Sequence, residues 1–417
     1  MTDLAIRGGL VVVPEGELER DLLVSDGRIQ NVVAPGAGTA SDELDARGLV
    51  VFPGVVDAHV HFNDPGRADW EGWERGTRGA AAGGVTTVCD MPLNSIPPTT
   101  TAQAFRAKRA AAKAAAHVDF ALGGGLTPDA DVAALHALGV VGVKAFLCDS
   151  GVPEFPRVDI ELISRTPGLV AVHAEDPALL LGRGASWARS RPTAAEVSAV
   201  RAPARTGARV HVVHVSTAAA LAELGPSMTA ETCPHYLVFT DDDVERVGPL
   251  LKCAPPIRDA AERERLWAAV ADGRIALVAS DHSPSSVARK SGGLWAAWGG
   301  IAGVQTLLPA LLTEGRRRGL PWTRLAELLC AVPARLLGLP TKGRIAPGLD
   351  ADLVLLDAER EWTLDAAALQ TRSGQSPYLG RTFRGLVRTT LVRGRIVYRD
   401  GEFPAAPGHG RFVPREV

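Results

Sequence analysis

The sequence lacks the features of a secreted, disulfide-bonded or membrane-spanning protein. Its few cysteines are odd in number and widely spaced, with no CxxC pair, which argues against a disulfide framework and for a reducing compartment. The five are Cys89, Cys148, Cys233, Cys253 and Cys330. No uninterrupted apolar stretch approaches the roughly 20 residues that span a bilayer. The N-terminus lacks the charged-then-apolar layout of a signal peptide. We therefore expect a cytoplasmic chain that does not associate with a membrane.

The chain also lacks an excess of charge of one sign. Its formal net charge is −2, so it offers no polycationic face, and nucleic acid is not an expected partner. Hydrophobic residues make up 46% and charged residues 22%, which is ordinary for a globular protein that acts on small molecules. With 417 residues the chain is long enough for more than one domain.

Both ends of the chain read as short strands and turns. Near the N-terminus, residues 10–13, 21–24 and 29–33 alternate or run apolar, and Asp26-Gly27 indicates a hairpin turn. Near the C-terminus, residues 351–357 and 389–398 are strand-like, and residues 399–401 form another turn. We expect residues 1–50 and 341–417 to assemble one small β-sandwich domain. The alternative is two separate β appendages.

The middle of the chain, residues 51–340, alternates apolar runs with Ala-rich amphipathic segments. The expected helices are residues 102–116, 130–138, 217–224 and 260–271. Besides the apolar run at 50–56, the expected strands are residues 85–89, 118–122, 141–146, 169–172, 210–213, 227–232 and 275–279. Eight strands alternating with helical segments over this length fit an α/β fold of the (β/α)8 TIM-barrel type better than an open sheet.

Chemistry in such a barrel lies where the strands end. The run at residues 50–56 leads into His59-Val60-His61, where the period of a strand places both imidazoles on one face. Two imidazoles on one face can bind one metal ion. The alternative is two polar residues on an exposed strand face.

Four further expected strands end in polar side chains. They are Lys144, His173, His214 and Asp281. Each has a structural alternative: a lysine that extends to solvent, a core histidine, or an aspartate that caps a turn. His211 competes with His214, because their offset places them on opposite strand faces. We choose His214, which stands at the strand end. Taken together, these strand ends predict a metal site.

Four histidines and one carboxylate exceed the three protein ligands of a catalytic zinc ion. They suit two ions that share a bridging water. A bridging anion is then needed, and Lys144 is the remaining candidate. A buried lysine with a lowered pKa could react with carbon dioxide to form a carbamate, which is a conjecture at this point.

The residues around these positions resemble the cyclic amidohydrolases, the family that contains dihydroorotases, hydantoinases and allantoinases. The signature is GVVDAHVH at residues 54–61, and the resemblance covers nearly the whole chain. Five stretches are most similar to the allantoinase branch: residues 61–67, 90–95, 144–148, 231–236 and 297–301. The stretch KGRIAPG at residues 342–348 is shared more widely. Asp149 departs from the pattern, since close relatives in that branch would carry a proline there.

The resemblance implies a binuclear centre in a barrel, with two divalent metal ions per chain. His59, His61 and Asp281 would hold one ion, His173 and His214 the other, and carboxylated Lys144 would bridge them. Zinc is the first expectation, although manganese, cobalt or iron would accept the same ligands. The resemblance also implies a homo-oligomer, either a tetramer or a dimer.

Position 63 bears on the substrate. Dihydroorotases resemble His-x-His-x-Arg there, with an arginine for the substrate carboxylate, whereas this chain has Asn63. An uncharged amide suits allantoin, and Asn94 and Ser283 could also contact the ring; Asn63 could equally be a turn residue. We expect ring opening of allantoin to allantoate, with Asp281 as base and then acid. Hydantoinase (dihydropyrimidinase) or dihydroorotase activity is the alternative, and a non-catalytic scaffold is a remote one.

Overall fold

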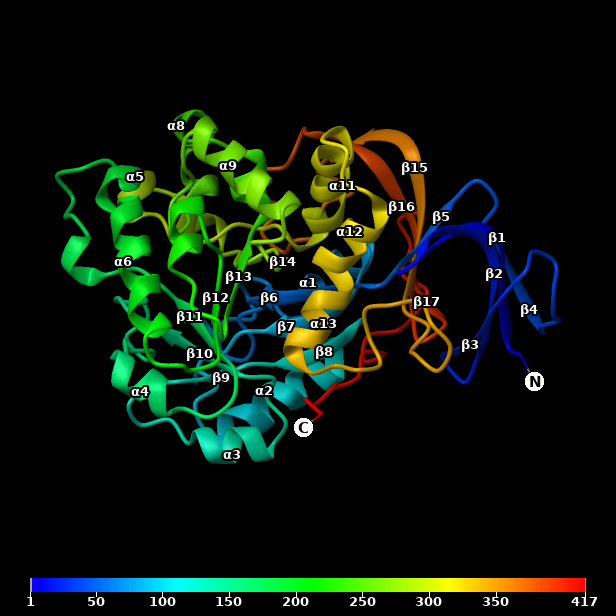
Figure 1. Ribbon diagram of the computed structural model, residues 1–417, viewed down its shortest axis with the longest axis horizontal. Helices are drawn as coiled ribbons and strands as arrows, with labels where there is room; N and C mark the ends of the chain where they lie inside the picture. The colour runs from blue at the N-terminus through cyan, green and yellow to red at the C-terminus, as the bar shows by residue number, and fades with distance from the viewer. Residues whose placement is uncertain (1, 417) are drawn as a thin grey trace.

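Strands from both ends of the chain share one sheet in the computed structural model, which describes residues 2–416 (Figure 1). The N-terminal strands are β1 (Leu4–Val13), β2 (Gly16–Ser25), β3 (Arg28–Val33), β4 (Asp42–Asp45) and β5 (Val50–Pro53). The C-terminal strands are β15 (Leu353–Thr363), β16 (Thr382–Val392) and β17 (Arg395–Arg399). Their order is β17-β16-β15-β5-β1-β2-β3, with β4 paired to β1. The two β-rich ends are therefore joined through the pairing of β5 with β15.

One expected strand is divided by a turn. The strand-like run at residues 389–398 forms the end of β16 and then β17, because Arg393 (φ 49°) and Gly394 (φ 72°) both adopt the left-handed backbone conformation. A two-residue hairpin turn of this kind matches the twist of the strands it joins. The expectation of one continuous strand was wrong, since an arginine at the first turn position gives no signal of a turn.

The expected apolar run at residues 50–56 is also divided. It forms β5 in the sheet and the start of β6 (Val55–Val60), which belongs to a different sheet. Gly54 lies between them, where an added Cβ would come within 2.2 Å of the Thr86 hydroxyl. Only glycine fits where the chain leaves one sheet for the other.

The middle of the chain forms parallel strands in two sheets. One contains β6, β7 (Val85–Asp90) and β8 (Asp119–Leu122). The other contains β9 (Gly124–Gly125), β10 (Val143–Phe146), β11 (Val170–His173), β12 (Val210–Val212), β13 (Met228–Thr232) and β14 (Leu277–Val278). The two sheets meet on both sides: the Val141 N–H donates to Leu122 O at 3.1 Å, and Val60 forms a parallel bridge with His282. The chain thus has an α/β fold with an additional sheet.

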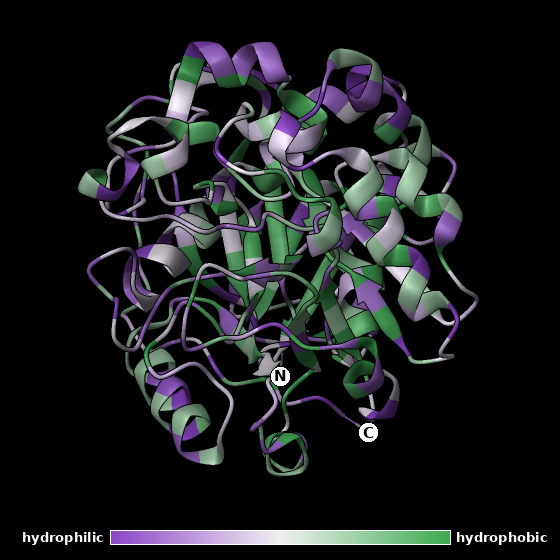
Figure 2. Cartoon of the chain, turned by 90° about the vertical axis from the view of Figure 1, so that its left-hand side faces the viewer, coloured by the Kyte–Doolittle hydropathy of each residue, from purple (hydrophilic) through white to green (hydrophobic). Residues whose placement is uncertain are grey.

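Helices surround these parallel strands, and Figure 2 shows apolar strands inside and hydrophilic residues on the outer helices. The α-helices are α1 (Trp73–Ala82), α2 (Ala102–Ala115), α3 (Val132–Ala137), α4 (Ile160–Arg165), α5 (Trp187–Ser190), α6 (Thr193–Ala204), α7 (Pro234–Val238), α8 (Asp241–Val247), α9 (Ala260–Ala271), α10 (Gly293–Ala296), α11 (Leu307–Arg317), α12 (Trp322–Ala326) and α13 (Val332–Leu337). Shorter turns are the 3₁₀ helices η1 (Pro177–Leu179), η2 (Ala218–Glu223), η3 (Gly248–Leu251), η4 (Val287–Lys290) and η5 (Val304–Thr306), and the π-helix η6 (Glu327–Ala331). Among the described helices, none has the length and apolar character needed to cross a membrane.

The expected helices are present with small shifts. Helix α9 has the expected bounds, and α2 ends one residue early. The Thr101 side chain accepts a hydrogen bond from the Ala104 N–H and so caps the start of α2. The segment expected at residues 217–224 is the 3₁₀ helix η2, because Gly225-Pro226 follows it and leaves too short a span for an α-helix.

A buried lysine connects the β8 strand to the start of β15. The Lys342 ammonium lies 2.6 Å from an Asp119 oxygen and 2.8 Å from an Asp352 oxygen. All three side chains are almost completely buried. Burial alone would lower the pKa of Lys342, but Asp352 and Asp119 raise it above its ordinary value. The interaction therefore fixes the additional sheet against the parallel strands.

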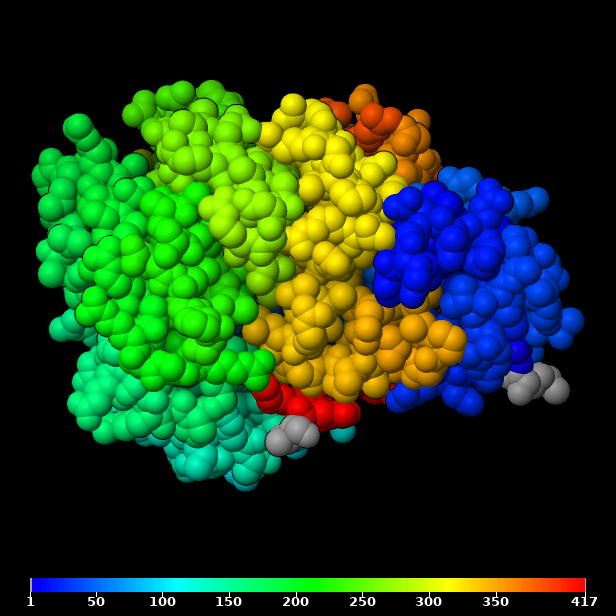
Figure 3. Space-filling view, viewed as in Figure 1, coloured from blue at the N-terminus to red at the C-terminus, as the bar shows by residue number. Residues whose placement is uncertain are grey.

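The last residues of the chain lie against β8 rather than in the additional sheet. Phe412 forms a parallel bridge with Phe120, and the Val413 N–H donates to Phe120 O at 2.8 Å. The space-filling view shows this C-terminal segment, in red, along the lower edge of the molecule (Figure 3). Sequence periodicity gave no signal for it, because it forms no regular strand.

Candidate active site

The polar strand ends surround one cavity of about 680 Å³. Its lining includes all six of the side chains expected to bind metal: His59, His61, Lys144, His173, His214 and Asp281. The first two come from β6 and its end, and the others from β10, β11, and the segments that follow β12 and β14. Because the strands are parallel, their carboxyl ends meet at the same edge, and side chains more than 200 residues apart converge there.

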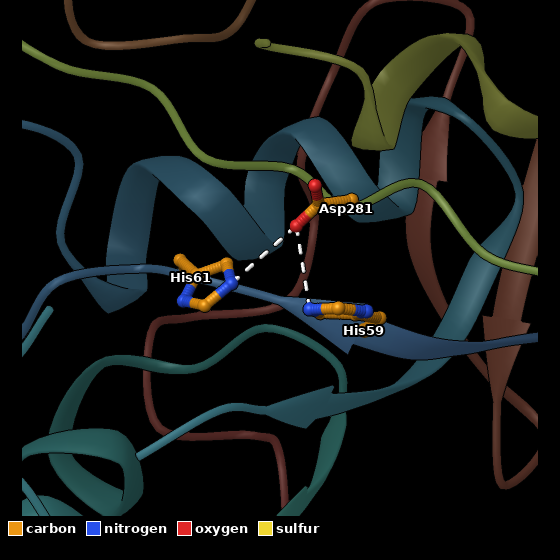
Figure 4. Close-up of side chains that lie close together, drawn as sticks. All are labelled: His59, His61 and Asp281. Carbon is orange, nitrogen blue, oxygen red and sulfur yellow. Dashed lines mark ion pairs between the residues drawn. The ribbon is translucent and has the colours of Figure 1, made fainter. Parts of the chain in front are cut away.

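One half of the cluster consists of His59, His61 and Asp281 (Figure 4). The Asp281 Oδ1 atom lies 3.3 Å from His59 Nε2 and 3.4 Å from His61 Nε2. Burial alone would raise the pKa of Asp281, but the neighbouring histidines lower it well below its ordinary value. The carboxylate is therefore an anionic donor placed between two imidazole nitrogens.

The other half consists of His173 and His214, with His173 Nδ1 at 3.1 Å from His214 Nε2. The His173 ring stacks on Phe146 at a centroid distance of 4.6 Å and an angle of 16°. Burial lowers the pKa of both histidines, and their mutual repulsion adds to this for His214. Two neutral imidazoles whose nitrogens face each other so closely are typical of a site for a shared cation.

Lys144 lies near histidines of both halves, with its ammonium nitrogen 5.4 Å from the centroid of the Phe146 ring. Its ammonium nitrogen is buried and makes no hydrogen bond to any residue that the structure describes. Burial lowers its pKa to about 8, against the opposing effect of Asp281 and Glu231. An amine with such a pKa is available in its neutral, nucleophilic form near neutral pH.

Two groups, Glu231 outside the lining and the Leu93 carbonyl within it, orient the histidines at β6. Glu231 Oε1 accepts from His59 Nδ1 at 2.7 Å, and its other oxygen lies 3.0 Å from His211 Nε2. The Leu93 carbonyl lies 2.5 Å from His61 Nδ1. Each contact leaves Nε2 of the ring directed at the cavity, and carboxylates or carbonyls commonly orient metal-binding histidines in this way. His211 does not line the cavity, unlike His214.

Glu175 orients the His173 ring in the same way. Its Oε2 lies 2.7 Å from His173 Nε2, which directs Nδ1 at the cavity. Arg191 donates to the same carboxylate at 2.6 Å. Cys148, His173 and Glu175 also lie close enough to hold an ion. That set fits a metal less well, since Glu175 is neutralised by Arg191 and burial raises the pKa of Cys148 to about 12.

Three of the expected site residues adopt a backbone conformation that side chains disfavour. Asn63 (φ 63°), His214 (φ 41°) and Asp281 (φ 45°) lie in the left-handed region. A non-glycine residue held in this region lowers the stability of the fold by about 1–3 kcal/mol, and such residues cluster at functional sites. Here the conformation occurs at the strand ends, where it turns each side chain relative to its strand.

The expected substrate contacts divide into two groups. Asn94 and Ser283 line the cavity, whereas Asn63 does not. The Asn63 amide accepts from Asn94 at 3.2 Å and donates to Pro284 O at 3.1 Å. Asn63 therefore holds Asn94 in place. Asp149, at the position that departs from the family pattern, also lines the cavity.

The donor set fits a pair of metal ions. Four imidazoles and one carboxylate face one cavity, and His59 Nε2 and Lys144 Nζ are buried there without a hydrogen-bond partner among the described residues. Unpartnered buried polar atoms are rare in folded proteins and call for a bound group. Their ligand type suits zinc or a related divalent ion.

Glu231, Glu175 and the Leu93 carbonyl were not predicted from the sequence. Glu231 contacts His59 across 172 residues of chain, and a carbonyl carries no sequence signal. Two signals were available: Glu231 opens the family-like stretch at residues 231–236, and it lies near the end of β13, next to the strand that carries His211. A carboxylate at a strand end next to a histidine cluster is a candidate for orienting those histidines.

Comparison with known sequences places the chain among metal-dependent hydrolases. The profile of the amidohydrolase family matches residues 50–150 and 193–397. The allantoinase of Rubrobacter xylanophilus is 47% identical over 99% of this chain and 97% of its own length. The allantoinase of Solibacter usitatus is 44% identical over 100% and 98%, and that of Escherichia coli 37% identical over 99% and 98%.

Solved structures of similar fold include hydantoinases. The L-hydantoinase (dihydropyrimidinase) of Arthrobacter aurescens superposes with a TM-score of 0.94 over the whole of both chains, at 33% identity. The D-hydantoinase of Bacillus sp. AR9 superposes with a TM-score of 0.92, at 28% identity, over 100% of this chain and 99% of its own. The similarity extends over both the parallel strands and the additional sheet.

Proposed function

The chain belongs to the amidohydrolase family, and from this premise we propose that it opens the ring of allantoin by hydrolysis, giving allantoate. The observation that carries the proposal is the near full-length similarity to allantoinases, at up to 47% identity, together with the polar cluster in the cavity. It is a hydrolase that acts on the C–N bond of a cyclic amide, as expected from the resemblance.

The same cluster supports a binuclear metal centre. We propose that His59, His61 and Asp281 hold one ion, that His173 and His214 hold the other, and that Lys144 bridges them as a carbamate. The support for the carbamate is that the buried Lys144 amine lines the same cavity as both halves and makes no hydrogen bond to a described residue. Zinc is the metal we propose first. When bound, the ions would lower the pKa of a shared water and polarise the ring carbonyl.

The side chains of the chain itself supply the proton transfer. An Asp281 oxygen accepts the proton of the attacking water and then delivers it to the departing ring nitrogen. The carboxylate is suited to this because it is anionic and faces the cavity. Asn94 and Ser283 are placed to donate to or accept from the ring amide, and Asn63 fixes the Asn94 side chain.

We further infer that the parallel strands close into a (β/α)8 barrel with boundaries near residues 51 and 340. The hydrogen bond from Val141 to Leu122 and the bridge between Val60 and His282 support closure. The additional sheet encloses a core of its own, which includes Ile6, Leu22 and Leu353. A separate core of this kind supports a small β-sandwich domain.

The test is a comparison of kcat/KM on allantoin, hydantoin and dihydroorotate, with metal content measured on the same sample. We expect about two ions per chain and allantoin as the preferred substrate by at least tenfold. Asp281→Asn, purified in parallel, controls for contaminating hydrolases. Preference for hydantoin would favour the hydantoinase alternative, which the similarity to the Arthrobacter enzyme motivates. Metal-loaded protein inactive on all three would contradict the proposal.

A separate test addresses Lys144. Protein loaded with metal in the presence of ¹³C-bicarbonate should show a carbamate carbon resonance, and Lys144→Met should lack it. Lys252 also lines the cavity and has a pKa lowered to about 8, chiefly by burial. Lys252→Met is therefore the matched control, and loss of the resonance in that variant instead would assign the carbamate elsewhere.

A further inference from the structure

A second cavity, of about 430 Å³, lies at the opposite ends of the parallel strands. Pro53, which precedes β6, and Ala276, which precedes β14, both line it. The metal cluster lies beyond the other ends of the same two strands. Residues of α12, of α13 and of β1 in the additional sheet line this second cavity. Its volume falls within the range of about 300–1,000 Å³ found for small-molecule sites.

The cavity carries a positive charge that the protein leaves uncompensated. Its charged lining consists of three arginines and one glutamate. Arg324 is paired with Glu327 at 3.0 Å and donates to Val270 O, so both of these side chains have partners. Arg335 and Arg344 are exposed, and within residues 2–416 their guanidinium groups make no hydrogen bond or ion pair. Two arginines whose guanidinium groups have no partner among the described residues therefore line one cavity.

The remaining wall is largely apolar. Ala326, Ala331 and Val332 line it and are partly exposed, whereas Val12 and Ile345, which also line it, are almost completely buried. A site with an apolar wall and a few charged groups orients a ligand that has an apolar body and a charged end.

The π-helix η6 contributes a second, independent observation. Glu327 and Ala331, its first and last residues, line the cavity. Single π-helical turns inserted between α-helices are rare and occur frequently at functional sites. This one joins α12 to α13 and packs against both β6 and β14.

We propose that this cavity binds a small organic anion. Arg335 and Arg344 hold its anionic group by charge-assisted hydrogen bonds, and its apolar body contacts the partly exposed Ala326, Ala331 and Val332. Carboxylates and phosphate monoesters share this chemistry. The site is separate from the proposed active site and does not depend on the substrate assigned there.

Calorimetric titration of the metal-loaded, full-length protein tests the proposal. The probes are hexanoate, phenyl phosphate, the neutral analogue hexanamide, and inorganic phosphate. We expect hexanoate or phenyl phosphate to bind, hexanamide to show no binding, and Arg335→Gln/Arg344→Gln to weaken the bound anion at least tenfold. Which of the two anions binds more tightly identifies the natural class.

Arg106→Gln is the matched control, because Arg106 is also exposed on a helix without a partner among the described residues. It should bind like the wild type. Any of four results would overturn the proposal. They are anion binding by the double variant equal to that of the wild type, hexanamide binding equal to that of the anions, binding of inorganic phosphate alone, and no binding of either organic anion. Unchanged allantoin hydrolysis in the double variant shows that it is folded.

Discussion

Asp281 combines a left-handed backbone conformation, a lowered pKa and contact with two imidazoles. Its replacement by asparagine keeps an oxygen donor but removes the group that accepts and returns the proton. General acid–base catalysis contributes about 10²–10⁴-fold to rates, so we expect Asp281→Asn to lower kcat by about that factor. Steady-state kinetics, with metal content and melting temperature on the same sample, measure this. Asp129→Asn, at an exposed position, should be unaffected; wild-type turnover by Asp281→Asn would refute the role.

Glu231 does not line the cavity and acts on the site through its contact with His59. Burial alone would raise its pKa, but His59 and His211 lower it to about 2, so it stays ionised while it accepts from His59 Nδ1. Loss of such an orienting carboxylate typically costs 10–100-fold in metal affinity. We expect Glu231→Gln to show that loss in a chelator-competition titration, and the exposed Glu161→Gln to show none. Unchanged metal affinity in Glu231→Gln would mean that His59 is held by other contacts.

For single residues, sequence reasoning predicted the side chains that line the cavity but not the side chains that orient them. His173 and Lys144 follow recognisable apolar strands, so their placement follows from the rule that parallel strands end at one edge. Glu231 contacts His59 and Glu175 contacts His173 through the orientation of their side chains, which the strand pattern does not indicate. Asn63 was expected to contact the substrate. In the structure its amide forms hydrogen bonds with Asn94 and Pro284, and no spacing in the sequence indicates these bonds.

Among the elements, strands and helices were predicted where periodicity is strong and missed where single residues decide. Helix α9 follows from its composition alone, and it matches the expected bounds. Gly54 and the Arg393-Gly394 turn divide apolar runs that otherwise read as continuous strands. The division at Gly54 depends on its close approach to Thr86, which is a tertiary contact. The division at Arg393-Gly394 depends on the left-handed φ angles of these two residues.

The junction between β8 and β15 offers a test of how the additional sheet is fixed. Lys342→Met would leave the Asp119 and Asp352 carboxylates buried without their shared ammonium. Removal of one partner from a buried ion pair costs about 3–5 kcal/mol, so we expect a clearly lower urea midpoint of unfolding. Lys113→Met, on the exposed face of α2, should unfold like the wild type. An equal midpoint for both variants would show that the pairing adds no net stability.

For the whole molecule, metal binding should stabilise the fold as well as enable turnover. The cluster draws side chains from β6, β10 and β11 and from the segments after β12 and β14, so a bound ion links distant parts of the chain. A ligand present at 1,000 times its Kd stabilises the folded state by about 4 kcal/mol. We expect chelation to lower Tm and abolish hydrolysis together, and added zinc to restore both. A chelated protein with unchanged Tm and turnover would contradict the metal centre.

The overall plan was predictable in outline, since strand-rich ends and an alternating middle follow from local sequence. The position of the C-terminal segment was not. Phe412 packs on Phe105 and Phe120, and an aromatic residue in a proline- and glycine-rich tail gives no indication of its partner.

The sheet shared by the two ends of the chain has a consequence for synthesis on the ribosome. Pro53 of β5 pairs with Leu353 of β15, so the partner of β5 emerges 300 residues later. At about 5–20 residues per second, that delay is roughly 15–60 s. During this interval β5 exposes an unpaired edge rich in valine, a template for pairing with another chain. The additional sheet can therefore be completed only when translation has nearly finished.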